Sequence, residues 1–104
     1  MDPRAVTYRE QVCARLDLVL EVLKFAKGIS RSEVADRIGV SPQSISNWTS
    51  GGVFPDQFAM YKLCRAYGVT ADYLWLDVVV GLPRWMADGL EAVSVGTSLE
   101  APSS

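Results

Sequence analysis

The side chains that could do chemistry in this sequence are amides, hydroxyls and carboxylates, without the histidine that most acid–base sites use. The chain has no histidine and two cysteines, Cys13 and Cys64, which are far apart and lack the C-x-x-C spacing of a metal or redox site. The carboxylates are scattered, and no glycine-rich phosphate loop is present. Because histidine is the commonest general base near neutral pH, these absences argue against an enzyme. We expect no catalytic residue, metal or cofactor, and we expect both cysteines to be core residues in a reducing compartment.

The segment GVSPQSISNW, at residues 39–48, offers a different kind of chemistry. It places Gln43, Ser46 and Asn47 on a stretch that otherwise suits a helix. An amide side chain carries a donor and an acceptor side by side, so it can form two hydrogen bonds with a complementary planar group. Pro42, just ahead of them, can offer only apolar contact. What these side chains can bind depends on how the surrounding helices position them.

The length and composition are those of one small globular domain. The chain has 104 residues, is 49% hydrophobic and has a net charge of −2, which is typical of a folded chain. No apolar run approaches the roughly 20 residues that span a bilayer. The charged N-terminus lacks the apolar core of a secretory signal. We therefore expect a cytoplasmic protein with no membrane partner.

Hydrophobic periodicity and capping signals predict an all-α fold. Apolar residues recur at helical spacing, and glycines, prolines and capping residues divide the chain into helices. Five helices are expected, over about residues 8–27, 31–38, 42–50, 55–67 and 70–77. Beyond residue 77 the pattern weakens to a turn at 81–83 and a short amphipathic helix. The polar composition of about the last ten residues predicts disorder.

The link between the second and third of these helices is short and well specified. Ser30 and Glu33 form an S-x-x-E capping box at the start of the second helix. Gly39 follows its end, where a left-handed conformation costs glycine little. Ser41 can cap the third helix, with Pro42 at its first position. So few residues lie between the two helices that they must meet at a steep angle.

Residues 29–51, ISRSEVADRIGVSPQSISNWTSG, resemble the helix-turn-helix of the phage repressor and Cro family, also called XRE-like. The positions that carry the resemblance are Ser30, Val34, Ala35, Ile38, Gly39, Val40, Ser41, Ile45, Ser46, Trp48 and Gly51. The similarity continues through FPDQFAMYKLCRAYGVTADYLW and covers about residues 10–77. It implies a compact five-helix, lambda-repressor-like domain over residues 1–77, followed by a short C-terminal extension over residues 78–104.

The resemblance implies a bacterial or phage regulator that binds double-stranded DNA sequence-specifically. In this family the recognition helix enters the major groove, and Pro42, Gln43 and Asn47 fall at its base-contacting positions. Amide side chains suit adenine, which presents an acceptor at N7 and a donor at N6. The positions implied for phosphate contact are Arg31, Ser41, Ser44, Ser46, Gly51 and Gly52.

The charge distribution is unusual for a chain that binds DNA. Basic side chains neutralise phosphates, yet this sequence has 10 basic and 12 acidic residues. The loop at 49–55, just after the recognition helix, contains no lysine or arginine. Residues 24–55 nevertheless carry a net charge of +2, so most of the acidity lies outside the motif. We expect weak binding by one copy and a need for dimerisation, a partner or clustered sites.

Apolar residues near the end of the domain are candidates for a homodimer interface. They are Trp75, Leu76, Val79, Trp85 and Met86, in the region through which relatives often dimerise. The alternative is that this segment folds back on its own core. A second hypothesis for the function also stays open: a helix-turn-helix adaptor or antagonist that binds RNA polymerase or another regulator. Its protein partner would dock on the acidic C-terminal half or on the tryptophan-rich extension.

Overall fold

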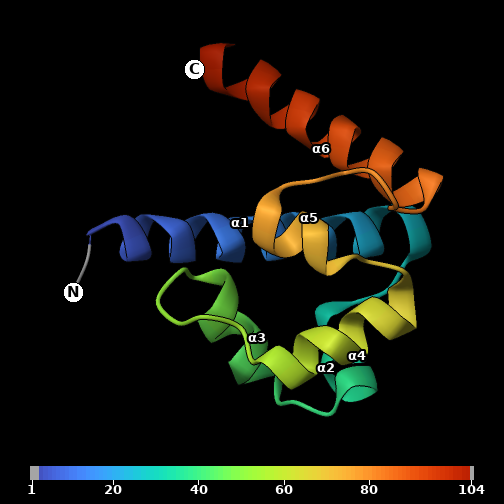
Figure 1. Ribbon diagram of the computed structural model, residues 1–104. Helices are drawn as coiled ribbons and strands as arrows, with labels where there is room; N and C mark the ends of the chain where they lie inside the picture. The colour runs from blue at the N-terminus through green and yellow to red at the C-terminus, as the bar shows by residue number, and fades with distance from the viewer. Residues whose placement is uncertain (1–2, 104) are drawn as a thin grey trace.

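The computed structural model describes residues 3–103 and shows an all-α protein (Figure 1). Within these residues the chain forms six helices and no strand: α1 (Pro3–Lys27), α2 (Arg31–Ile38), α3 (Pro42–Thr49), α4 (Gln57–Tyr67), α5 (Ala71–Leu76) and α6 (Arg84–Ser103). The all-α fold expected from the sequence is confirmed. The first helix begins earlier than expected, at Pro3, because proline fits the first turn of a helix, where its missing N–H costs nothing.

The long helix α1 lies between two groups of elements. In Figure 1, α6 lies on one side of α1, and α2, α3 and α4 lie on the other. Val22 of α1 meets Gly89 of α6, whereas the Cys13 Sγ of α1 donates a hydrogen bond to the Val53 carbonyl oxygen in the loop between α3 and α4, at 3.3 Å. Since α1 is covered on both sides, it carries apolar residues on more than one face.

One apolar core joins all six helices. Its fully enclosed members include Leu16, Leu20 and Leu23 of α1 and Leu63 of α4. Cys13 is buried and Cys64 is half-buried, and both are free thiols. No helix between residues 3 and 103 combines the length and the apolar character needed to cross a bilayer. In the same part of the chain, acidic residues and cysteines form no group that could hold a metal ion.

The C-terminal extension forms a long helix that packs on α1. Met86 and Leu90 of α6 are buried in the common core, and the Lys27 ammonium lies over the Trp85 ring, 4.6 Å from its centroid. The extension therefore folds back on its own domain, which was one of the two alternatives. This corrects the assignment of Met86 to a dimer interface, because a fully enclosed side chain has no surface to offer a second copy.

The last segment of the described chain belongs to α6. The helix α6 continues to Ser103, through the segment whose polar composition predicts disorder. Once Pro83 has started the helix, alanine, leucine and glutamate recur along it, and the next proline comes only at residue 102. Amino-acid composition contains no information on the packing of the preceding turns of α6 against α1.

Candidate DNA-binding surface

The turn between α2 and α3 has the geometry that its capping residues predict. The Ser30 hydroxyl accepts from the Glu33 N–H at 3.1 Å, which completes the capping box together with the Glu33 carboxylate. Gly39 ends α2 in the left-handed conformation, with φ of 74°. Ser41 then caps α3 by accepting from the Ser44 N–H, also at 3.1 Å. Both helix boundaries are thus fixed by local hydrogen bonds.

Two apolar side chains hold α3 against the rest of the domain. Ile45 and Trp48 are three positions apart on the helix, and both are buried in the core. Ala35 of α2 is also buried, where a small side chain permits close approach of the helices. With its inner side fixed in this way, α3 turns the residues Pro42, Gln43, Ser46 and Asn47 outward, and all four are exposed.

The two outward amides of α3 are hydrogen-bonded to each other. The Gln43 Nε2 donates to the Asn47 Oδ1 at 3.0 Å, as residues four apart on a helix can do. This bond leaves the Gln43 Oε1 as an acceptor and the Asn47 Nδ2 as a donor. The pair therefore presents one acceptor and one donor together on the exposed side of α3.

Two of the serines around the start of α3 cap the helix, and a third has an exposed hydroxyl outside the cap. The Ser41 and Ser44 hydroxyls lie 3.1 Å apart, so both take part in the cap of the helix. The Ser46 side chain is exposed. The Ser46 backbone carbonyl oxygen accepts from the Ser50 N–H at 3.1 Å and from the Thr49 hydroxyl at 3.3 Å. Ser46 is thus the serine of α3 whose hydroxyl lies outside the capping bonds of the helix.

Arg31 has carboxylate partners that the sequence pattern does not reveal. Its Nη2 contacts the Asp17 Oδ1 at 2.8 Å and the Glu21 Oε1 at 2.9 Å, both on α1. Partial burial lowers the pKa of the guanidinium, but the hydrogen bonds to the two carboxylates outweigh this effect and the pKa is raised. Arg31 therefore joins α2 to α1, and its charge is already balanced within the protein. This pairing competes with the phosphate contact that the resemblance implies for Arg31, and that contact stays a prediction.

The two glycines after α3 also differ from each other. The Gly51 N–H donates to the Trp48 carbonyl oxygen at 3.3 Å, so it is used inside the protein and is not free for a phosphate. This corrects the assignment of Gly51. Its φ of 87° needs glycine, which explains why the residue occurs there. Gly52 is exposed on the loop.

Two cations that the sequence pattern misses lie near the ends of α3. The Arg9 Nε of α1 donates to the Gly51 carbonyl oxygen at 3.0 Å, which brings a guanidinium to the loop that has no lysine or arginine of its own. The Lys62 Nζ of α4 donates to the Ile38 carbonyl oxygen at 3.4 Å, beside the turn that precedes α3. The same ammonium lies over the Phe58 ring, 4.3 Å from its centroid. Neither cation lies near α3 in the sequence.

The remaining candidates for a dimer interface are only partly accessible. Leu76 is 67% exposed and Val79 is 53% exposed, and they flank the C-terminal end of α5. Trp75 is half-buried and packs against the core, as does Trp85, whose ring is covered by Lys27. The neighbouring Val80 is 80% exposed. The accessible apolar surface in this region is therefore centred on Leu76, Val79 and Val80.

Comparison with known proteins places the chain in a family. A family model described as helix-turn-helix matches residues 19–74, which include α2, the turn and α3. No curated protein and no solved structure matches the chain. The matched region covers more than half of the sequence and ends within α5. The chain therefore belongs to the helix-turn-helix family of XRE-like, Cro and phage-repressor regulators, and it carries a lambda-repressor-like DNA-binding domain.

Proposed function

We propose that this protein is a transcriptional regulator that reads a specific duplex DNA sequence by placing α3 in the major groove. The observation that carries the proposal is the exposed, hydrogen-bonded pair of Gln43 and Asn47 on a helix whose other side is fixed by Ile45 and Trp48. A recognition helix must present polar groups outward and hold them still. In α3 the amides of Gln43 and Asn47 face outward, and the burial of Ile45 and Trp48 holds the helix in place.

The paired amides favour adenine as the base that is read. Adenine offers an N7 acceptor and an N6 donor in the major groove. The Asn47 Nδ2 can donate to N7 while the Gln43 Oε1 accepts from N6, so the two residues can read one base jointly, or each can read its own after their mutual bond opens. Pro42, at the start of α3, would contact a thymine methyl group. A well-formed pair of such hydrogen bonds discriminates by about 1–3 kcal/mol.

Phosphate contacts would come from elements on both sides of α3. Arg9 and Lys62 supply the cations, and the Gly52 N–H and the Ser46 hydroxyl supply neutral donors. Ser41 and Ser44 would act indirectly, by fixing the start of α3 so that its N-terminal N–H groups face the backbone. If Arg9 and Lys62 are the cations that contact phosphates, the salt dependence of binding should be shallow for one copy. The slope of log K against log salt concentration changes by roughly 0.9 for each neutralised phosphate.

The direct test is selection of bound sequences from a random duplex pool, followed by affinity measurement on the selected site. Gln43→Ala and Asn47→Ala should each weaken binding to that site by about 1–3 kcal/mol and relax the preference at one or two positions. Gln11→Ala, an exposed amide on α1, is the matched control and should change neither quantity. Unchanged affinity and preference in both α3 variants would contradict the base contacts.

A second measurement separates the phosphate contacts from base reading. Arg9→Gln and Lys62→Gln should weaken binding to all duplexes alike and lower the salt slope by about one unit each. Arg31→Gln, whose cation is already paired within the protein, should leave the slope nearly unchanged. If the salt slope falls for Arg31→Gln and not for Arg9→Gln or Lys62→Gln, then Arg31 contacts a phosphate and the other two cations do not.

We also propose that the protein binds its site as a homodimer through the exposed apolar surface formed by Leu76, Val79 and Val80. A two-fold arrangement would place two copies of α3 about 34–36 Å apart, one turn of DNA. Selected sites should then be palindromic with that spacing. Leu76→Asp should shift sedimentation toward the monomer and weaken binding to the full palindrome more than to a half-site. A monomeric wild-type protein that binds single half-sites would contradict this proposal.

A further inference from the structure

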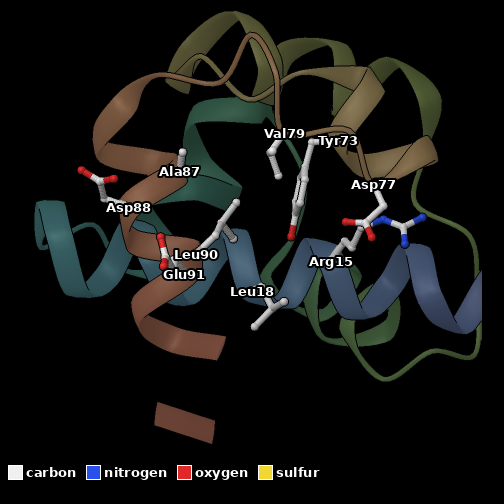
Figure 2. Close-up of a pocket in the computed structure, with 9 residues that line it drawn as sticks. All are labelled: Arg15, Leu18, Tyr73, Asp77, Val79, Ala87, Asp88, Leu90 and Glu91. Atoms are coloured by element: carbon white, nitrogen blue, oxygen red, sulfur yellow. The ribbon is translucent and has the colours of Figure 1, made fainter. Parts of the chain in front are cut away.

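A cleft of about 510 Å³ lies between the DNA-binding domain and the C-terminal extension (Figure 2). It is bounded by α1, by α5 with the segment that follows it, and by α6. Its volume falls within the range of small-molecule sites in proteins. Leu18 of α1 and Leu90 of α6 give it an apolar lining. No residue of α2, α3 or α4 lines the cleft, so it is separate from the proposed DNA-binding surface.

Tyr73 gives this cleft a polar group that has no protein partner. The residue is only 3% exposed, and its N–H is used in the cap of α5. The Tyr73 hydroxyl makes no hydrogen bond within the part of the chain that the structure describes. Every fully enclosed side-chain nitrogen or oxygen in that part has a partner, so this hydroxyl oxygen must be partly accessible. Figure 2 shows the hydroxyl directed between α5 and α1, into the space that the lining residues surround. A ligand in the cleft can therefore complete a hydrogen bond that the protein leaves open.

The charges around the cleft favour a cation. Three acidic residues line it, Asp77, Asp88 and Glu91, against one arginine, Arg15. The Arg15 Nε donates to the Leu74 carbonyl oxygen at 2.9 Å, which holds the guanidinium at the end of α5, where it keeps its positive charge. Asp88 has a loose, exposed ion pair with Arg84, 3.8 Å away. Asp77 and Glu91 have no ion pair among the residues that the structure describes.

We propose that this cleft binds a small organic cation, an ammonium group carried on an aromatic or branched aliphatic body. The apolar body lies against Leu18 and Leu90, the ammonium is attracted by Asp77 and Glu91, and the Tyr73 hydroxyl accepts a hydrogen bond from the ammonium. Because the ligand contacts α1, α5 and α6 together, it holds the extension against the domain. The proposal does not depend on DNA binding, and its test uses no DNA.

The test compares three probes of similar size and different charge, titrated into the full chain by calorimetry and by amide chemical shifts. They are phenethylammonium, the neutral phenethyl alcohol and the anionic phenylpropanoate. Phenethylammonium should bind about tenfold more tightly than the alcohol, as expected for one partly screened charge interaction. The anion should bind least. Shifts should be centred on the amides of Leu18, Val79 and Leu90.

Matched variants locate the site. Glu91→Gln and Asp77→Asn should each lower the affinity for phenethylammonium about three- to tenfold, and Tyr73→Phe about threefold, with unchanged circular dichroism. Asp36→Asn, an exposed carboxylate on α2, makes the same change of charge outside the cleft and should have no effect. The proposal is overturned if no probe binds at millimolar concentration, if the three probes bind alike, or if Asp36→Asn lowers affinity as much as Glu91→Gln.

Discussion

The contact between α6 and α1 offers a quantitative test of how the extension is held. A Cβ built on Gly89 would lie 2.5 Å from the Val22 Cγ1 and 3.3 Å from its Cγ2. Carbon atoms in contact are normally about 3.5–4.0 Å apart, so the shortfall is roughly 1 Å. Val22 is branched at Cβ and 1% exposed, so its side chain has neither an easy rotamer nor free space to turn into. Gly89→Ala should therefore force α6 away from α1.

Two opposite effects decide the change in the free energy of unfolding. Replacing a glycine by alanine inside a helix stabilises the helix by roughly 1 kcal/mol. Overpacking a core costs about 1–3 kcal/mol, occasionally more. Since this overlap meets a stiff side chain at a helix crossing, we expect the packing cost to win, with a net destabilisation of about 1–2 kcal/mol. In a domain of this size that lowers Tm by roughly 4–16 °C.

Urea and thermal unfolding, followed by circular dichroism, would compare the wild type with Gly89→Ala, Val22→Ala and the double variant. Val22→Ala alone should destabilise the protein, because it opens a cavity in the core. It also removes the methyl groups that the new Cβ would meet. The double variant should therefore be at least about 1 kcal/mol more stable than the sum of the single changes predicts. A Gly89→Ala variant as stable as the wild type, or two changes that simply add, would contradict a steric overlap between residue 89 and Val22.

Three further predictions concern single groups. Arg31→Gln should lower stability by about 1 kcal/mol or less, since its ion pairs are partly exposed, and the loss should shrink at high salt in denaturation curves. Burial raises the pKa of the Cys13 and Cys64 thiols, so alkylation near neutral pH should be slow in the folded protein and fast in urea; equal rates would contradict their burial. Burial also raises the pKa of Tyr67 and Tyr73, so the folded state holds these protons more tightly than the unfolded state. Stability should therefore fall as pH rises above about 10, and absorbance titration should show late ionisation of two tyrosines.

The helix-turn-helix could be predicted from the sequence because its determinants are local. Ser30 and Glu33 cap α2 within one turn, and Ser41 caps α3 through an N–H three residues away. Gly39 takes the left-handed conformation that its place after α2 requires. Each of these interactions joins residues that are close in the chain, so residue type and spacing are enough to identify them.

The parts that could not be predicted depend on contacts between distant residues. Arg9 and Gly51 are 42 positions apart, and nothing in either segment indicates that a guanidinium of α1 reaches the loop after α3. Arg31 similarly pairs with carboxylates that precede it by 14 and 10 positions. The burial of Met86 follows from the docking of α6 on α1, which its own weak amphipathic pattern did not specify. Periodicity shows that a helix has an apolar side, but it does not show what covers that side.

The arrangement of charges explains how an acidic chain can carry the proposed DNA-binding surface. Residues 56–104 contain six acidic and three basic side chains, yet Lys62 of this half points to the turn before α3. The carboxylates of Asp88 and Glu91 lie on α6, which α1 separates from α3 (Figure 1). A helix with its side chains is about 10–12 Å across, whereas exposed charges are screened over about 8 Å at physiological salt. The acidic extension should therefore repel DNA bound at α3 only weakly, and lowering the salt concentration should make that repulsion measurable. Neutralising Asp88 and Glu91 should strengthen DNA binding at low salt and have little effect at physiological salt.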